Sequence, residues 1–211
     1  MKPIHIFKYI FLLLVYMFCS HRINTIDELK RIPCNYGIEI DLRDHINGDI
    51  YIAHDPFILG ENFEEFLKYY HHSFIILNIK SERIEWKILE LLQKYNIKDY
   101  FFLDSSFPMI YQLSTTGEKN IALRFSEFEG IDTIIKMKDK INWVWVDCFT
   151  SNPLTKDIYN KLKHLNLKIC FVSPELQNQP EKIEHYKRYF QENNIILDMI
   201  CTKYYNIENW K

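Results

Sequence analysis

The chain has 211 residues, enough for one domain but short for a complete eight-stranded α/β barrel, which typically takes about 200 to 250. It is 47% hydrophobic and 16% aromatic, with only 5 glycines and 7 prolines, so it can fill a sizeable core and is neither disordered nor of low complexity. The formal net charge is −2 and lysines are interspersed with glutamates, so no basic run indicates a nucleic-acid-binding surface.

The N-terminal segment is apolar and has two interpretations. Lys2 and Lys8 precede an apolar run over residues 9–19, which resembles a signal-peptide core and is too short for a comfortable membrane span. Cleavage near Ser20 would remove the strand that ends at His21. We therefore expect residues 1–12 to be an apolar extension, with a leader as the alternative, and residues 13–211 to form the domain. A start codon assigned too far upstream would give the same pattern.

Short apolar runs rich in β-branched and aromatic residues predict strands. Most of these runs are continuously apolar, which is typical of strands buried on both faces of a parallel sheet. They cover residues 14–20, 37–42, 50–53, 74–79, 100–103, 121–125, 143–146, 167–172 and 197–201.

Segments with helical spacing of apolar residues lie between these runs. They cover residues 25–31, 63–70, 83–95, 108–113, 130–138, 156–165 and 180–193. Asn24 or Thr25 with Glu28 is a helix-start pattern, and Ser81 is expected to cap the helix over 83–95.

Residues 50–53 are expected to pair with 37–42 through the Asn47-Gly48 turn, as a short hairpin after the second strand. Without this extra strand, eight strands alternate with helices. That alternation predicts the α/β class and a single compact (β/α)8 barrel of the TIM type.

The five cysteines are an odd set without metal-binding spacing, and several lie in apolar strand-like runs. Buried thiols in a reducing compartment explain them better than disulfides or zinc. We therefore expect a cytoplasmic protein, or an exported one if residues 1–20 act as a signal peptide. Membrane association is not expected unless the N-terminal run is a leader, and the sequence leaves the oligomeric state open.

Polar residues follow the apolar strands at their carboxyl ends, where barrel enzymes carry their active sites. Glu39 and Asp41 are two apart on one strand, so both side chains point to the same face. Two carboxylates on an inward face need a compensating cation, and Mg²⁺ or Ca²⁺ would suit them. An Glu-x-Asp on the exposed face of an edge strand would give the same pattern.

His21 and His54 each close an apolar strand and are candidates for an acid/base pair, although a histidine at a strand end is often structural. Lys80 also closes an apolar strand, and a buried ammonium group needs an anion such as a phosphate or a carboxylate.

Four ordered motifs are similar to those of the glycerophosphodiester phosphodiesterase family, within the superfamily of phosphatidylinositol-specific phospholipases C. They are His21-Arg22, Glu39-Ile-Asp41, His54-Asp55 and Asn78-Ile-Lys80, and the run from Ile200 to Lys203 resembles the family's last strand. Leu103-Asp-Ser-Ser106, Arg124-Phe-Ser-Glu127 and Val172-Ser-Pro-Glu175 resemble a compact bacterial subgroup.

The resemblance implies an activity and a role for each matching residue. His21 and His54 would be the catalytic acid and base, and Arg22 and Lys80 would bind the phosphate. One divalent cation, Mg²⁺ or Ca²⁺, would be held by Glu39, Asp41 and Asn78. Cleavage of a small glycerophosphodiester, or of a related polyol or sugar phosphodiester, is the implied reaction. The second-tier site candidates are Asp104, Arg124, Asp147 and Glu175. For each of them, an ordinary loop ion pair or helix cap is an equal alternative.

The chain departs from the family pattern at several positions. Ile23 replaces a glycine, Asn78 replaces the third metal carboxylate, and Lys203 replaces an aspartate near the end of the last strand. An amide oxygen can bind Mg²⁺ or Ca²⁺ but adds no charge, so the cation would be held more weakly. A non-catalytic phosphate-binding barrel therefore remains an alternative, as does a lyase or transferase acting on phosphodiesters in surface-glycan biosynthesis.

Overall fold

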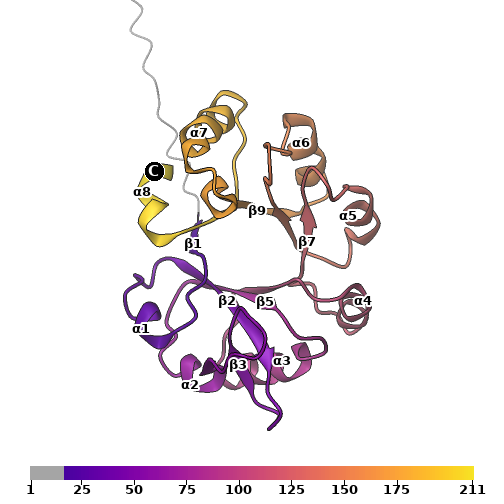
Figure 1. Ribbon diagram of the computed structural model, residues 1–211. Helices are drawn as coiled ribbons and strands as arrows, with labels where there is room; N and C mark the ends of the chain where they lie inside the picture. Colours follow the sequence, from indigo (N-terminus) through magenta and orange to yellow (C-terminus); the bar gives the residue numbers. More distant parts are fainter. Residues whose placement is uncertain (1–16) are drawn as a thin grey trace, which may run out of the picture.

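The computed structural model describes residues 17–211, and within them eight parallel strands form a closed ring (Figure 1). The strands follow one another around the ring in chain order. They are β1 (Met17–Ser20), β2 (Gly37–Asp44), β5 (Phe74–Ile79), β6 (Tyr100–Leu103), β7 (Ala122–Phe125), β8 (Trp143–Val146), β9 (Lys168–Val172) and β10 (Met199–Thr202).

The ring is complete because β1 pairs with β10 and β6 pairs with β7, and these two pairings differ in length. Between β1 and β10 four residue pairs are in register, from Met17 with Met199 to Ser20 with Thr202. Between β6 and β7 one parallel bridge joins Phe102 to Ile121, and the Phe102 N–H donates to the carbonyl oxygen of Asn120 over 2.8 Å. The predicted α/β barrel is therefore confirmed, with its weakest joint at the β6–β7 seam.

A helix lies outside the ring between each strand and the next, and the last helix follows β10 (Figure 1). These helices are α1 (Ile26–Leu29), α2 (Phe63–Leu67), α3 (Glu85–Lys94), α4 (Phe107–Thr115), α5 (Asp132–Met137), α6 (Lys156–His164), α7 (Ile183–Glu192) and α8 (Ile207–Trp210). Three short 3-10 turns join them, η1 (Pro174–Gln177), η2 (Pro180–Lys182) and η3 (Tyr204–Asn206).

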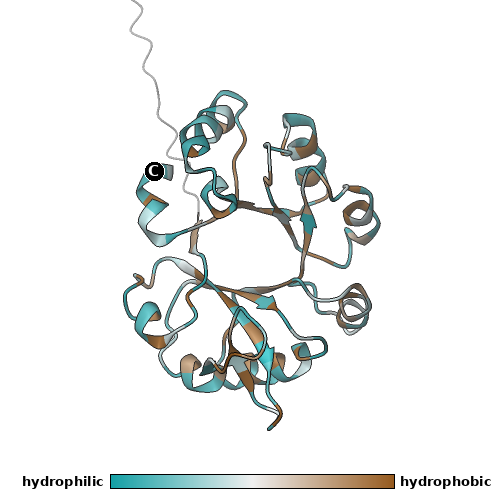
Figure 2. Cartoon of the chain, viewed as in Figure 1, coloured by the Kyte–Doolittle hydropathy of each residue, from teal (hydrophilic) through white to brown (hydrophobic). Residues whose placement is uncertain are grey.

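The core has two parts because alternate residues of a strand point to opposite faces. Outward residues such as Ile38 and Ile40 pack under the helices in one buried cluster. Inward residues fill the barrel in a second cluster, where the rings of Phe101 and Trp143 lie 4.9 Å apart. Figure 2 shows the resulting pattern, hydrophobic strands inside a layer of helices that are largely hydrophilic.

A small antiparallel extension leaves the ring after β2. The predicted hairpin strand is present as β3 (Ile50–Ile52), paired with the end of β2. Gly48 in the connecting turn has φ +84, a conformation that glycine adopts without strain. A further strand, β4 (Glu61–Asn62), pairs with β3 and was not expected from the sequence.

The predicted elements are recovered within a few residues, but one predicted cap is wrong and one helix was not predicted. The capping box of Thr25 and Glu28 is confirmed, with the Thr25 hydroxyl accepting from the Glu28 N–H over 3.1 Å. The predicted Ser81 cap is wrong, because Arg83 adopts φ +71 and α3 begins only after Ile84, without a side-chain cap. The short helix α8 was missed, since four residues are too few to show helical spacing.

Part of the N-terminal prediction lies outside the described residues. The extension over 1–12 and the first residues of the predicted strand 14–20 cannot be compared, while Met17–Ser20 is a strand as expected. Four of the five cysteines are free and buried as predicted, and Cys34 is free and exposed. Within residues 17–211 no helix is long and apolar enough to cross a membrane.

Candidate active site

The carboxyl ends of β1, β2 and β5 bring most of the predicted site residues together. In the β2–β5 ladder Asp41 lies beside Asn78, and Glu39 is two residues before Asp41 on the same face. His21 follows β1 and Lys80 follows β5. Because parallel strands end at the same rim of a barrel, side chains far apart in the sequence meet at one mouth.

Both predicted metal-site carboxylates are fully buried, so the exposed-edge alternative for Glu39 and Asp41 is wrong. One Glu39 oxygen accepts from the Arg22 backbone N–H over 2.7 Å, and the other accepts from the Asn78 side-chain amide over 2.8 Å. Burial and the nearby charge of Asp41 raise the pKa of Glu39 to about 7. The site thus holds concentrated negative charge that a cation would relieve.

Asn24 fixes the position of Asp41 from both sides. Its side-chain amide donates to Asp41 Oδ2 over 2.9 Å, and its own oxygen accepts from the Asp41 backbone N–H over 3.0 Å. This double contact orients the carboxylate without filling its second oxygen. Asp41 Oδ1 has no hydrogen-bond partner among the described residues, and the Lys80 ammonium lies 3.5 Å from it.

Lys80 and Arg22 are the cations closest to this carboxylate pair. Lys80 lies between two acids, 3.5 Å from Asp41 and 3.6 Å from Asp104, which meets the expectation that its ammonium group needs an anion. Arg22 is 3.8 Å from Asp41, and its side chain is 43% exposed. Arg22 also has φ +55, a strained conformation for a non-glycine residue and one that clusters at functional sites.

His54 is held between Arg22 and Asp55. The Arg22 guanidinium contacts His54 Nε2, and His54 Nδ1 lies 2.8 Å from Asp55 Oδ1. A guanidinium group can only donate, so Nε2 accepts and the proton of the neutral ring is on Nδ1, bonded to Asp55. In this arrangement Arg22 occupies Nε2, which becomes free to exchange a proton at the mouth only when Arg22 turns to a ligand.

His21 occupies a more buried position beside Glu39. Its Nε2 is 3.7 Å from Glu39 Oε2, and its Nδ1 has no hydrogen-bond partner among residues 17–211. Burial and the positive charge of Lys203 lower the pKa of His21 to about 3, so the ring is neutral at neutral pH. Through Arg22, whose backbone contacts Glu39 and whose side chain contacts His54, the two histidines border one site.

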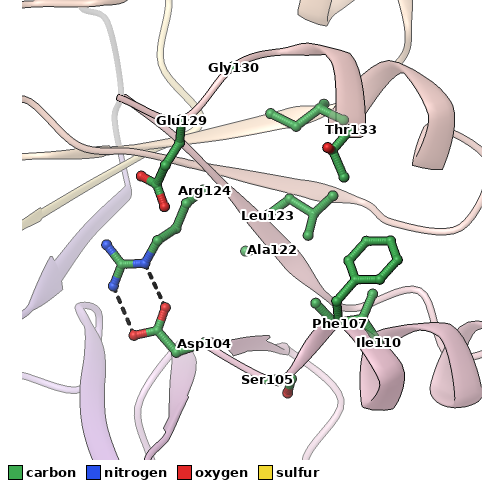
Figure 3. Close-up of a pocket in the computed structure, with 11 residues that line it drawn as sticks. Asp104, Ser105, Phe107, Ile110, Ala122, Leu123, Arg124, Glu129, Gly130 and Thr133 are labelled. Carbon is green, nitrogen blue, oxygen red and sulfur yellow. Dashed lines mark hydrogen bonds and ion pairs between the residues drawn. The ribbon is translucent and has the colours of Figure 1, made fainter. Parts of the chain in front are cut away.

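The second-tier candidates divide into two groups. Arg124 on β7 contacts Asp104 through two hydrogen bonds of 2.6 and 2.8 Å, drawn in Figure 3, and also pairs with Asp147. Since Asp104 faces Lys80, this network borders the site. Glu175 instead accepts from the Thr202 hydroxyl and the Lys203 N–H, and so ties η1 to the end of β10.

The donor atoms at the mouth suit a hard divalent cation. Asn78 Oδ1 and Asp41 Oδ1 are both buried oxygens without a hydrogen-bond partner among the described residues, and Glu39 adds a second carboxylate. Within residues 17–211 no three His, Cys, Asp or Glu side chains are grouped to hold a metal ion, so the set depends on the amide oxygen. An oxygen-only set of this kind fits Mg²⁺ or Ca²⁺ rather than a softer metal.

Solved structures with the same architecture carry the name of one enzyme class. An Agrobacterium tumefaciens protein assigned as a glycerophosphoryl diester phosphodiesterase has a TM-score of 0.66 and 12% identity, over 89% of this chain and 93% of its own. A glycerophosphodiester phosphodiesterase of the same organism has a TM-score of 0.63 and 14% identity, over 88% and 96%. The chain has the fold of these phosphodiesterases.

A Parabacteroides distasonis glycerophosphoryl diester phosphodiesterase extends this likeness, with a TM-score of 0.63 and 12% identity over 92% of this chain and 85% of its own. No family model matches the sequence, and no curated protein is significantly similar to it. At such identities the likeness to solved structures is one of fold.

Two contacts that position site residues were not predicted from the sequence. The Arg43 guanidinium donates to the carbonyl oxygens of His54, over 2.8 Å, and of Lys80, over 3.2 Å, and so fixes both segments. Its position two residues after Asp41 could have indicated the shared face. Lys203 donates to the His21 carbonyl oxygen over 3.3 Å, a contact that only the closure of β10 onto β1 creates.

Proposed function

We propose that the chain is a metal-dependent phosphodiesterase that cleaves a glycerophosphodiester, or a related polyol or sugar phosphodiester, with His21 and His54 as its acid/base pair. The observation that supports this most is the convergence of two imidazoles and two cations on one buried carboxylate pair. His21 contacts Glu39, Arg22 contacts His54 and Asp41, and Lys80 contacts Asp41. The solved structures with the same fold carry the corresponding activity in their names.

Arg22 and Lys80 are the proposed phosphate-binding groups. Arg22 is partly exposed at the mouth, and both of its side-chain contacts, to His54 and Asp41, can be exchanged for phosphoryl oxygens. Lys80 is held between Asp41 and Asp104, which fixes its ammonium group where charge develops on the phosphorus oxygens.

The two histidines divide the proton transfers between them. A substrate hydroxyl next to the phosphoester attacks phosphorus and gives its proton to one imidazole, while the bond from phosphorus to the leaving oxygen breaks and that oxygen takes a proton from the other. His21 suits the base role because burial and Lys203 keep its ring neutral. The proton for the leaving oxygen then comes from His54, whose Nδ1 is held by the Asp55 carboxylate. A cyclic phosphate forms, and water then opens it by the reverse exchange.

Glu39, Asp41 and Asn78 are the residues that would hold the divalent cation. When bound, Mg²⁺ or Ca²⁺ would neutralise charge on the phosphoryl oxygens and orient the attacking hydroxyl. Asn24 keeps Asp41 aligned for this role, and the Asn78 amide does the same for Glu39.

The test is turnover by the purified full chain, followed by phosphorus NMR with Mg²⁺ or Ca²⁺ on a set of glycerophosphodiesters and sugar phosphodiesters. We expect cleavage, and a loss of about 10² to 10⁴-fold in His21→Ala and in His54→Ala. His71→Ala is the matched control, because His71 is exposed and precedes β5, away from the mouth.

Each other result has a defined meaning. If the folded protein binds glycerol phosphate but cleaves no diester, it is a binding module and the proposal fails. If a cyclic phosphate accumulates and persists, the protein is a lyase, and hydrolysis is ruled out.

A further inference from the structure

Most of the exposed large hydrophobic side chains lie around the mouth of the barrel. Of thirteen such side chains in residues 17–211, nine lie between the carboxyl end of a ring strand and the first residue of the helix that follows it. One of them, Ile46, lies in the β2–β3 turn, and we call the other eight the apolar rim. They are Phe57, Ile58, Leu59, Phe107, Phe128, Phe149, Tyr204 and Tyr205.

One part of the apolar rim forms a wall of the cavity beside His54. This cavity, of about 460 Å³, is lined by the polar groups of Asn24 and His54 and by Ile58 and Leu59. Asn24 is also bonded to Asp41, so one lining residue joins this cavity to the proposed cation site, and the cavity has an apolar wall on its Ile58 and Leu59 side. A ligand that extends from the phosphate into this space meets hydrocarbon.

A second cavity lies on another side of the mouth, between α4 and α5 (Figure 3). Its volume is about 340 Å³, and Asp104 and Arg124 form its polar side. Phe107 and Ile110 lie opposite this ion pair in Figure 3. Asp104 also contacts Lys80, so this cavity too adjoins the phosphate-binding groups.

The loop after His54 holds its apolar side chains outward at a conformational cost. Phe57 is fully exposed and has φ +63, a region that bulky residues rarely enter. Its neighbours Ile58 and Leu59 are also largely exposed, so three apolar side chains in a row face outward. Such a patch indicates a surface that is covered in use.

We infer that the apolar rim inserts into a lipid surface, so that the diester cleaved under the proposed function is the headgroup phosphodiester of a membrane lipid whose headgroup carries a hydroxyl next to the phosphoester, as a glycerol headgroup does. The rim is contributed by separate loops around an opening, and Phe128 and Phe149, whose ring centroids are 6.1 Å apart, form another part of it. A protein partner or a second copy seated there would cover the opening that the substrate needs. A lipid surface covers the rim and supplies the substrate together.

Arg22 and Lys80 complete the match to a lipid headgroup. Both cations are set back from the apolar rim toward the barrel interior. With the rim among the acyl chains, they would lie at the depth of the lipid phosphate. This contact is peripheral and needs no spanning helix.

The experiment measures cosedimentation of the full chain with phosphatidylcholine vesicles, with and without phosphatidylglycerol. We expect the wild-type protein to bind, and Phe57→Ser combined with Phe128→Ser to lower the partition coefficient by roughly tenfold or more. The control is Tyr69→Ser combined with Ile196→Ser, which removes two apolar side chains that are 47% and 44% exposed and lie outside the rim. The control should bind as the wild type does.

Soluble-diester turnover separates this inference from the proposed function on which its substrate rests. Neither Phe57 nor Phe128 contacts the site, so the rim variant should keep wild-type turnover of glycerophosphocholine. Vesicle binding without any diester cleavage would refute the proposed function and leave the docking surface standing. Cleavage without vesicle binding, or a concentration-dependent dimer that the rim variant abolishes, would overturn the lipid inference.

Discussion

Replacing Asn78 with aspartate tests how this site compensates its charge. The Asn78 amide now donates to Glu39 Oε1 over 2.8 Å, and Asn78 is only 6% exposed. The change removes a hydrogen bond to a buried charged acceptor, which contributes about 1.5 to 3 kcal/mol, and puts a third carboxylate beside Glu39 and Asp41. In chelator we expect Asn78→Asp to lower the free energy of unfolding by at least about 2 kcal/mol. For a domain of this size that corresponds to a fall of about 4 to 8 °C in Tm.

A divalent cation should offset most of this loss. The added charge should tighten binding of Mg²⁺ or Ca²⁺ at least tenfold, which is about 1.4 kcal/mol. Thermal unfolding in EDTA and in excess Mg²⁺ or Ca²⁺ measures both effects, with exposed Asn35→Asp as the control for one added charge. Equal stability of Asn78→Asp and wild type in EDTA, with equal metal-induced shifts, would refute the assignment of Asn78 to the cation site.

Three further predictions concern the loops around the mouth. Arg124→Met should cost about 3 to 5 kcal/mol in chemical unfolding, because Asp147, whose side chain is 2% exposed, loses its only ion-pair partner among the described residues and keeps only the neutral donors Trp145 and Gln177. Adding Asp147→Asn should restore part of this stability, and a double variant as unstable as the single one would contradict the prediction. Burial opposes ionisation of Glu127, but the N–H groups of Ser151 and Thr150 lower its pKa to about 2. The stabilising effect of ionised Glu127 is therefore complete above its unfolded-state pKa of 4.5, and it is lost as the pH falls from there toward about 2. Glu127→Gln should cost about 1 to 2 kcal/mol at pH 7 and flatten the dependence of stability on pH between these two values. Gly60→Ala should unfold the β3–β4 pair, because a Cβ there would lie 1.7 Å from the Ile52 backbone oxygen. Gly130→Ala, with open space around its Cβ, is the control and should be tolerated. Equal melting temperatures of the two variants would refute the predicted clash.

The sequence predicts the barrel well because its strands are buried on both faces. Continuous apolar runs such as Phe74–Ile79 and Trp143–Val146 are recovered with their exact bounds, and the alternation along β2 correctly gives Glu39 and Asp41 a common face. A continuous apolar run indicates a strand buried on both faces, and polar residues that alternate within such a run share one face.

The contacts between segments could not be predicted in the same way. That Arg22 touches His54, or that Arg43 fixes the backbones of His54 and Lys80, depends on how loops fold over the rim. The low pKa of His21 likewise depends on its burial and on Lys203, which is distant in sequence and adjacent only because β10 pairs with β1. Local patterns carry no information on such long-range neighbours.

The single bridge between Phe102 and Ile121 makes the β6–β7 pairing the weakest point of the barrel wall. Separating β6 from β7 breaks one residue pairing, whereas separating β1 from β10 breaks four, so we expect local opening of the barrel to begin between β6 and β7. The ion pair of Asp104 with Arg124 also joins β6 to β7, at the carboxyl ends of the two strands, and so holds this pairing closed. A ligand that loosens Asp104 through Lys80 therefore also changes how readily the barrel wall opens.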